Sequence, residues 1–248
     1  MTPPRPRIAV IQHEVGCPLG LFDGWVRATA GEVTIVRPYA GQSLPAIDET
    51  DGLVVLGGSM SATDDQRYPW LTDTNVLLRR AVDHGLPTLG ICLGHQLLTV
   101  ACGGHVAPNP AGKQMGVVPV GFTAVATTER LFASVAGSPA VSAIQWNSDI
   151  SVEIPPNATV LATTAAGVPQ AMRVGAAAWG VQFHPEADAE IVTGWAEADG
   201  PMTPAAREAI AGIAAAAPTL ASTWRPLADR FVAIAAERDS CVGRVTSQ

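Results

Sequence analysis

The stretch PTLGICLGHQLL, residues 87–98, decides the fold of this chain. An apolar run typical of a β-strand leads into it, and an apolar helical pattern leaves it through Leu97 and Leu98. Between the two, Cys92 stands in the pattern Gly-x-Cys-x-Gly. A strand, a sharp turn and a helix in this order predict a nucleophile elbow, which holds one reactive side chain above the end of a parallel sheet.

The steric demands of so tight a turn explain the residue types around the cysteine. Gly90 and Gly94 leave room where a Cβ would collide with neighbouring backbone. We expect Cys92 itself to adopt an unfavourable φ/ψ, a strain that the surrounding fold must offset. Its sulfur would lie at a helix N-terminus, where the dipole and the free N–H groups favour thiolate over thiol. The plainer alternative is that Cys92 is a small buried apolar residue.

Length and composition set the class of protein. The 248 residues are 48% hydrophobic and 15% charged, which suits one α/β domain with a full core. A net charge of −7 argues against a nucleic-acid partner. No apolar run approaches the roughly 20 residues that span a bilayer, and no apolar signal core follows the first seven residues. We therefore expect no membrane partner.

Cysteine usage indicates the compartment. Four cysteines, at positions 17, 92, 102 and 241, form no Cys-x-x-Cys pair. This pattern favours a reducing cytoplasm and no structural zinc. We predict a cytoplasmic protein that needs neither a metal nor a cofactor.

The first hundred residues alternate short apolar strands with helical patterns. We expect strands over 7–12, 33–36 and 52–56 before the strand of the elbow, and helices over 19–30 and 71–84. This alternation is typical of a parallel, doubly wound sheet.

After the elbow helix the pattern changes to short β-like pieces, at 116–120, 122–126, 141–146, 159–164, 169–174 and 177–183. We predict that they extend the sheet in a mixed, partly antiparallel way. Three Ala-rich helices follow, over 188–197, 204–216 and 219–237, with Pro218 marking a break or a first turn. The last ten residues look frayed. We expect a single domain over 1–248, with a core at 7–195 and a helical segment at 196–240.

The second stretch with chemical potential is WGVQFHPE, residues 179–186. A free cysteine thiol has a pKa of about 8.5, so it needs a base or a positive neighbour to react near neutral pH. His184 at a strand end can supply that base and can later protonate a leaving amine. Glu186 can orient the imidazole and stabilise its charged form. Standing alone, His184 would be read as a structural histidine.

The third stretch is Gly57-Gly58, directly after an apolar strand. Attack on an amide creates an oxyanion that needs two preorganised N–H donors. The N–H of Leu93 can be one donor, and the N–H of Gly58 can be the other. The alternatives are a simple turn or a phosphate-binding loop, but no Gly-x-Gly-x-x-Gly or Walker pattern follows.

Together these stretches resemble the class I (triad) glutamine amidotransferases, most closely stand-alone domains like that of GMP synthetase. The resemblance covers roughly residues 7–195 and rests on GICLGHQ at 90–96, QFHPE at 182–186, LGGSM at 56–60 and YPWL at 68–71. It implies a flavodoxin-like, three-layer α/β fold, a mostly parallel sheet with helices on both faces. It also implies hydrolysis of the glutamine side-chain amide through a γ-glutamyl thioester on Cys92.

The resemblance also assigns roles at the site. His184 would be the acid/base and Glu186 its partner, with Gly58 and Leu93 as oxyanion donors. Substrate would contact residues Gly57, Gln96, Asn147 and Ser148. Three places depart from the family pattern. Asn147 stands where relatives often have His, Gln114 stands where they often have Glu, and Asp73 and Asn75 bracket the place where a Glu often follows Pro-Trp-Leu.

Three functions stay open on these residues. The leading one is a glutaminase that passes ammonia to an acceptor on another chain, such as a separate synthetase subunit, or releases it. The second is a peptidase that cleaves a γ-glutamyl conjugate, because such a substrate presents the same carbonyl to the thiolate. The third is a non-enzymatic regulatory module on the same fold.

A few other residues have weaker claims to the site. His13 at the carboxyl edge of the sheet is a candidate for lying near it, though not for catalysis. We expect His95 and His105 to be structural, Cys102 to pack within or beside its helix, and Asp64 and Asp65 to form a turn rather than a metal pair.

Overall fold

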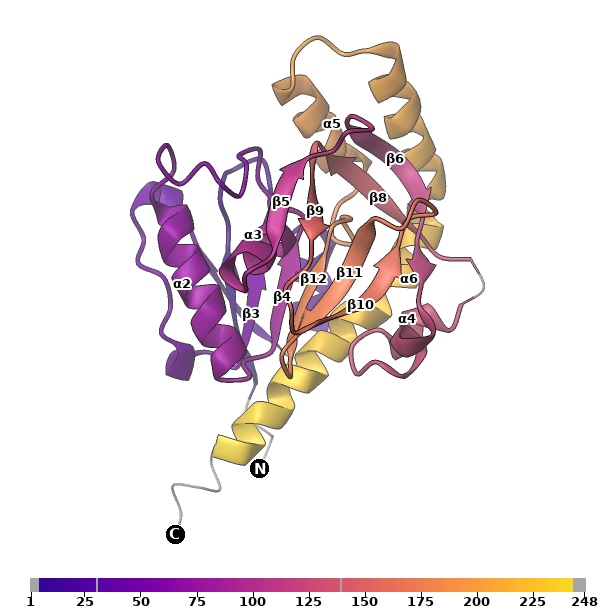
Figure 1. Cartoon of the computed structure of the whole chain (residues 1–248). Helices are drawn as coiled ribbons and strands as arrows, with labels where there is room; N and C mark the ends of the chain where they lie inside the picture. Colours follow the sequence, from indigo (N-terminus) through magenta and orange to yellow (C-terminus); the bar gives the residue numbers. More distant parts are fainter. Residues whose placement is uncertain (1–4, 30, 139, 243–248) are drawn as a thin grey trace.

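The computed structural model describes residues 5–29, 31–138 and 140–242. Its centre is an eight-stranded sheet (Figure 1). In spatial order the strands are β2 (Glu32–Val36), β1 (Arg7–Ile11), β3 (Gly52–Val55), β4 (Thr88–Ile91), β12 (Ala178–Val181), β11 (Pro169–Val174), β10 (Ala158–Thr163) and β7 (Gly121–Phe122).

The sheet has a parallel half and an antiparallel half. β2, β1, β3, β4 and β12 run parallel, whereas β11, β10 and β7 are antiparallel to their neighbours. Every residue of β3, β4 and β12 is buried. Such continuous burial explains their short, largely apolar sequences, since both faces of a parallel sheet are covered.

Helices cover both faces of the sheet. The helices α2 (Trp70–Asp83) and α3 (Leu93–Ala101) pack on the face that carries Ala9, Ile11 and Val55. On the opposite face lie α1 (Leu21–Ala28), α5 (Ala189–Ala198) and α6 (Pro204–Val242). The short α4 (Ala133–Ala136) and the 3₁₀ turns η1 (Pro38–Ala40), η2 (Ile47–Glu49) and η3 (Ala124–Thr128) complete the helical elements of the described residues. The three-layer prediction is therefore confirmed.

The C-terminal helix corrects one prediction. Instead of two helices separated at Pro218, one helix of 39 residues runs from Pro204 to Val242 with Pro218 and Pro226 inside it. A proline within a helix costs about 3 kcal/mol or more. The helix nevertheless continues because its apolar side, including Trp224 and Phe231, is buried against the sheet.

The second half of the chain differs from the prediction in its pairing. Only β7, β10 and β11 of the described strands extend the main sheet in antiparallel fashion. The other strands form two separate ribbons, β5 (His105–Pro108) with β9 (Asp149–Glu153), and β6 (Gln114–Pro119) with β8 (Ser142–Asn147). The expected strand over 122–126 is mostly the 3₁₀ turn η3, and the sequence pattern does not predict β9.

Two predictions fall partly outside the described residues. The frayed end includes 243–248, and the expected absence of a signal core involves residues 1–4. Within the described ranges, no helix is both long enough and apolar enough to cross a membrane.

Candidate active site

Cys92 occupies the predicted strained turn between β4 and α3. Its φ of 50° and ψ of −105° make it the one non-glycine residue with positive φ among those described. A Cβ on Gly94 would lie 2.0 Å from the carbonyl oxygen of Val55, and one on Gly90 would lie 2.5 Å from that of Gly94. Both glycines are therefore required by sterics, as predicted for an elbow.

His184 reaches the site from the loop that follows β12. Its backbone N–H donates to the carbonyl of Ile144 at 2.8 Å, which ties the loop to β8. Its ring atom Nδ1 lies 2.8 Å from Oε1 of Glu186, and both side chains are buried. The ring also packs against Trp195, with the ring centroids 4.5 Å apart. The imidazole thus has a fixed plane and a fixed carboxylate partner.

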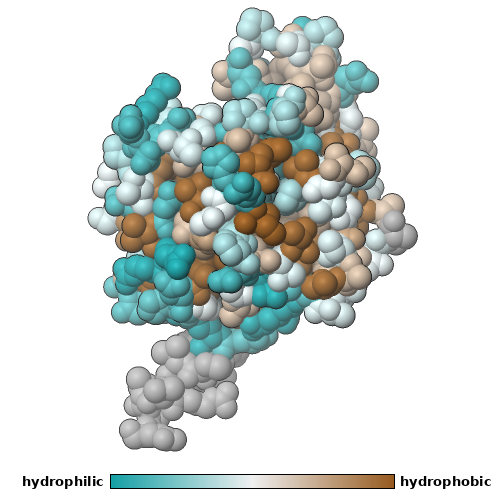
Figure 2. All heavy atoms as spheres, in the orientation of Figure 1, coloured by the Kyte–Doolittle hydropathy of each residue, from teal (hydrophilic) through white to brown (hydrophobic). Residues whose placement is uncertain are grey.

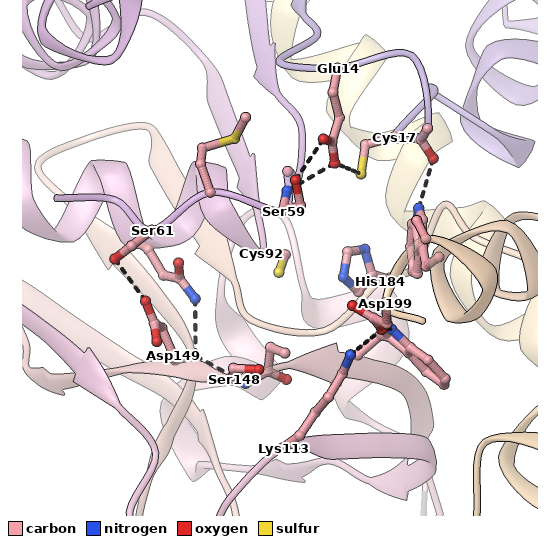
Figure 3. A pocket seen from close by; sticks show the side chains of 18 of the residues that line it. Glu14, Cys17, Ser59, Ser61, Cys92, Lys113, Ser148, Asp149, His184 and Asp199 are labelled. Carbon is pink, nitrogen blue, oxygen red and sulfur yellow. Dashed lines mark hydrogen bonds and ion pairs between the residues drawn. The ribbon is translucent and has the colours of Figure 1, made fainter. Parts of the chain in front are cut away.

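Gly57 shows how close the two reactive groups are. A Cβ placed on it would lie 3.2 Å from Cε1 of His184 and 3.7 Å from Cβ of Cys92. Both side chains line the same cavity, where Figure 3 shows them side by side. The sequence separates these residues by almost a hundred positions, and the pairing of β12 with β4 brings them together.

The charges around His184 favour its protonated form. Burial alone would lower its pKa, but the negative charges of Glu186 and Cys92 outweigh burial and raise the pKa to about 10. An imidazolium beside the sulfur stabilises a thiolate. For His13 and His95, by contrast, burial is the dominant influence and lowers the pKa of each to about 4.

The other cysteines have surroundings that favour the thiol. Burial and then the carboxylate of Glu14 raise the pKa of Cys17, which lines the same cavity. Burial also raises the pKa of Cys102, which is half-buried just after α3. The side chain of Cys241 is outside the described part of the structure.

The loop after β3 runs beside Cys92. A Cβ on Gly58 would lie 2.5 Å from Sδ of Met60 and 2.8 Å from Cδ2 of Leu93, so a larger residue would require both side chains to move. The next residue, Ser59, donates its N–H and its hydroxyl to the carboxylate of Glu14, at 2.8 and 2.7 Å (Figure 3). Glu14 therefore holds this loop in place.

Two buried amides, those of Gln96 and Asn147, form another part of the cavity lining. Nε2 of Gln96 and Nδ2 of Asn147 both donate to the main-chain carbonyl of Asp149, each at 3.0 Å. These bonds fix the orientation of both amides, and they leave Oδ1 of Asn147 buried and without a hydrogen-bond partner among the described residues. Ser148 lines the cavity next to Asn147, and the carboxylate of Asp149 accepts from Ser61.

Two of the departures from the family pattern, Gln114 and Asn147, face each other. Gln114 on β6 pairs in register with Asn147 on β8, and Nδ2 of Asn147 donates to Oε1 of Gln114 at 3.3 Å. A neutral amide pair therefore fills this place, and the two replacements suit one another.

A further part of the cavity lining is formed by Lys113, Trp146 and Asp199. Lys113 forms an ion pair with Asp199, and its ammonium lies 4.7 Å from the centroid of the Trp146 ring. The indole N–H of Trp146 donates to the same carboxylate at 3.0 Å. These side chains give the cavity a charged and aromatic side.

The cavity has a volume of about 660 Å³. Besides Cys92, His184, Gly58, Gln96, Asn147 and Ser148, which the sequence motifs indicate, its lining includes residues that sequence reasoning missed: Glu14, Cys17, Lys113, Asp149, Trp195 and Asp199. Sequence reasoning also missed Gln182, which lies just after β12 and has its amide nitrogen 3.6 Å from the sulfur of Cys92. Its place two residues before His184 in the QFHPE motif is the signal that could have found it.

The remaining candidates lie away from the cavity lining or play structural parts. His95 is fully buried, and its Nε2 lies 3.0 Å from the hydroxyl of Ser151, as expected for a structural histidine. His13 is buried beneath Gly58. Asp64 accepts from the N–H of Ser61 in a turn, and the described residues include no cluster that could hold a metal ion.

Comparison with known proteins identifies the family. Residues 26–191 match the family described as glutamine amidotransferase class-I. The chain belongs to the class I glutamine amidotransferases. A relative named as a putative glutamine amidotransferase-like protein, YfeJ of Salmonella typhimurium, is 32% identical over 192 residues, which are 76% of this chain and 79% of that protein.

Other relatives of this class I amidotransferase differ in name and length. Gamma-glutamyl peptidase 3 of Arabidopsis thaliana is 28% identical over 149 residues, 59% of this chain and 58% of the peptidase. GMP synthases also match, and the chain covers 27% of the one from Cytophaga hutchinsonii. The solved structure of a glutamine amidotransferase from Thermotoga maritima superposes with a TM-score of 0.80 over 92% of this chain and 99% of that one, at 24% identity. This likeness confirms the predicted flavodoxin-like fold.

Proposed function

We propose that this protein hydrolyses the side-chain amide of glutamine, or of a γ-glutamyl compound, through a thioester on Cys92. The observation that carries the proposal is the arrangement of three groups, of which Cys92 and His184 line one cavity and Glu186 contacts the ring of His184. A cysteine on a strained elbow, an imidazole beside it and a carboxylate 2.8 Å from that imidazole are the parts of a Cys-His-Glu triad.

The first half of the reaction forms the thioester. The Cys92 thiolate attacks the γ-carbonyl carbon, and the oxyanion is stabilised by the N–H groups of Leu93 and Gly58. The imidazolium of His184 then gives its proton to the amide nitrogen, the C–N bond breaks and ammonia leaves. Glu186 keeps the imidazole oriented and stabilises its positive charge throughout.

The second half releases glutamate. The now neutral His184 takes a proton from water, and the hydroxide attacks the thioester carbonyl at the same oxyanion donors. The C–S bond breaks, the Cys92 thiolate is restored, and His184 is again protonated. The side chains named here and one water complete the balance of atoms and charge.

The wall of amides suits the amino-acid end of the substrate. The carbonyl of Asp149 occupies the amino groups of Gln96 and Asn147, so their amide oxygens can accept from an α-ammonium group. The carboxylates of Glu14, Asp64 and Asp149 around the cavity add negative potential. On this basis we assign Gln96, Asn147 and Ser148, which line the cavity, to substrate binding. Gly57 is buried outside the cavity lining, so its assignment rests on the family resemblance alone.

The extent of the cavity favours a second candidate, the cleavage of larger γ-glutamyl conjugates. A volume of about 660 Å³ is in the range for ligands larger than one amino acid. Lys113 and Asp199 lie on the His184 side of the cavity, where a leaving amine would depart (Figure 3), and Trp195 also lines the cavity.

One comparison of substrates tests both candidates. Purified protein is given glutamine or a γ-glutamyl dipeptide, and release of ammonia or of the free amino acid is measured. Cys92→Ala should abolish both activities, whereas Cys102→Ala, outside the cavity, should keep them. Turnover of glutamine favours an amidotransferase that passes ammonia to an acceptor chain, such as a synthetase subunit. Turnover of the dipeptide alone favours a peptidase.

Failure of a glutamine-like chloroketone to label Cys92 would favour the non-enzymatic module.

A further inference from the structure

Gln182 is a buried polar residue with no part in the triad. It follows β12, is fully buried, and its backbone N–H donates to the carbonyl of Gln170 at 2.9 Å. Its amide nitrogen Nε2 lies 3.6 Å from Sγ of Cys92. We infer that Gln182 is a positioning residue whose amide N–H holds the Cys92 sulfur as a thiolate. This inference rests on the proposed function, because it requires Cys92 to react in that form.

The orientation of the Gln182 amide is fixed by a chain of hydrogen bonds. The chain starts at the carbonyl of Asp149, which can only accept, so the amino group of Gln96 must face it. The same amino group donates to Oε1 of Gln182 at 3.2 Å. Turning the Gln182 amide around would place two amino groups against each other. Its amino group therefore points at the sulfur.

This arrangement favours the negative form of the sulfur. A hydrogen bond to the charged form of a group stabilises that form, and charged acceptors make stronger bonds than neutral ones. In a buried site, little water is available to replace the amide as a donor. Unlike an imidazolium, the amide does not titrate, so its contribution holds whether His184 is protonated or neutral.

A purely structural role is the competing explanation, and the chain offers a matched control for it. Gln145 and Gln170 form a buried amide pair beside this network, through Nε2 of Gln145 and Oε1 of Gln170. No contact joins Gln170 to the sulfur of Cys92 in the described structure. Gln170→Met therefore removes a buried amide of the same size without touching the sulfur.

The test measures the rate at which iodoacetamide alkylates Cys92, by peptide mass spectrometry, as a function of pH. Gln182→Met removes the donor. Gln182→Glu keeps the shape of the side chain and the oxygen that accepts from Gln96, but it replaces the N–H donor to the sulfur by an oxygen. This variant therefore distinguishes the effect of the contact with the sulfur from the effect of the hydrogen bond to Gln96. We expect Gln182→Met to raise the pH midpoint of alkylation by about one unit. On the acid side of that midpoint, alkylation should therefore be about tenfold slower than in the wild type. Gln182→Glu should move it further, and Gln170→Met should leave it in place.

Two results would overturn the inference, and they are distinguishable. If wild-type Cys92 reacts faster than Cys102 and both Gln182 variants keep the wild-type midpoint, the positioning role is wrong while the proposed function stands. If wild-type Cys92 reacts no faster than Cys102 and no amide is hydrolysed, the proposed function is wrong, and the role inferred for Gln182 is wrong as well. Thermal unfolding of each variant shows whether the fold is retained, and Gln182→Glu, being isosteric, keeps the test open if Gln182→Met does not fold.

Discussion

Nδ1 of His184 lies 2.8 Å from Oε1 of Glu186, and both side chains are buried. A buried carboxylate at this distance fixes the imidazole in one orientation and compensates its positive charge. The consequence is a histidine that keeps its proton far above the pH at which a free imidazole loses it. Catalysis by an imidazolium and a thiolate would therefore persist into alkaline solution.

The first prediction concerns the pH dependence of hydrolysis. Because the pKa of His184 is raised to about 10, activity should fall on the alkaline side only as pH approaches that value. Glu186→Gln removes the main charge that raises this pKa, so the alkaline limb should move to lower pH. The measurement is kcat against pH. Glu190→Gln, on the exposed surface of α5, is the control, and an unchanged alkaline limb in Glu186→Gln would contradict the assignment.

The second prediction concerns the loop beside Cys92. Glu14 accepts two hydrogen bonds from Ser59, the residue after Gly58, and so positions the proposed oxyanion donor. Glu14→Ala should lower kcat by about tenfold, less than the loss of an oxyanion donor itself. Alkylation of Cys92 by iodoacetamide creates no oxyanion and should proceed at the wild-type rate. A loss of alkylation together with kcat would instead mean that Glu14 supports the whole site. Glu49→Ala, on an exposed 3₁₀ turn, serves as the control.

The third prediction concerns stability of the elbow. Gly94→Ala would put a Cβ 2.0 Å from the backbone carbonyl oxygen of Val55, so the elbow helix must move away from the sheet. We expect a loss of about 3 kcal/mol in the free energy of unfolding, at the upper end for overpacking. Gly24→Ala, in the middle of α1 and with open space around it, should gain up to about 1 kcal/mol. Denaturant unfolding of the two variants measures this difference in the free energy of unfolding. No loss of stability in Gly94→Ala would show that the elbow can relax, which would contradict the prediction.

The fourth prediction concerns the amino-acid end of the substrate. Asn147→Leu removes a buried amide oxygen beside the cavity, which has no partner within the described residues, and also the bonds to Gln114 and Asp149. We expect KM for glutamine to rise by about tenfold, the effect of losing one bond to a charged group, with a smaller change in kcat. An analogue without the α-amino group should lose less on this substitution than glutamine does. Equal losses for both compounds would show that Asn147 does not face the ammonium.

Much of the fold could be predicted because local sterics and burial determine it. A Cβ at Gly90 would collide with the backbone of the turn itself, and one at Gly94 would collide with Val55 on the neighbouring strand, so the motif indicates an elbow packed against a sheet. The short apolar runs of β3, β4 and β12 likewise indicate a covered parallel sheet. The continuity of α6 could not be predicted, because the tertiary packing of residues such as Trp224 outweighs the local cost of Pro218.

The residues of the candidate site likewise fall into those that the sequence could predict and those that it could not. Motifs indicate that Cys92 and His184 act together, and the structure places both in one cavity. Gln182 could have been added from its place in the QFHPE motif, two residues before His184. The wall of Lys113, Trp146 and Asp199 could not, because it depends on how α5 docks against β6 and β8, which no local pattern encodes.

The central claim is that the sulfur of Cys92 carries the γ-glutamyl group during turnover. The most direct measurement is acid quenching of the wild-type protein during hydrolysis of glutamine or a γ-glutamyl dipeptide, followed by peptide mass spectrometry. We predict a γ-glutamyl adduct on the peptide that contains Cys92 and no adduct or turnover in Cys92→Ala. Turnover that continues in Cys92→Ala, or that proceeds in the wild type with the adduct on another residue, would contradict the account.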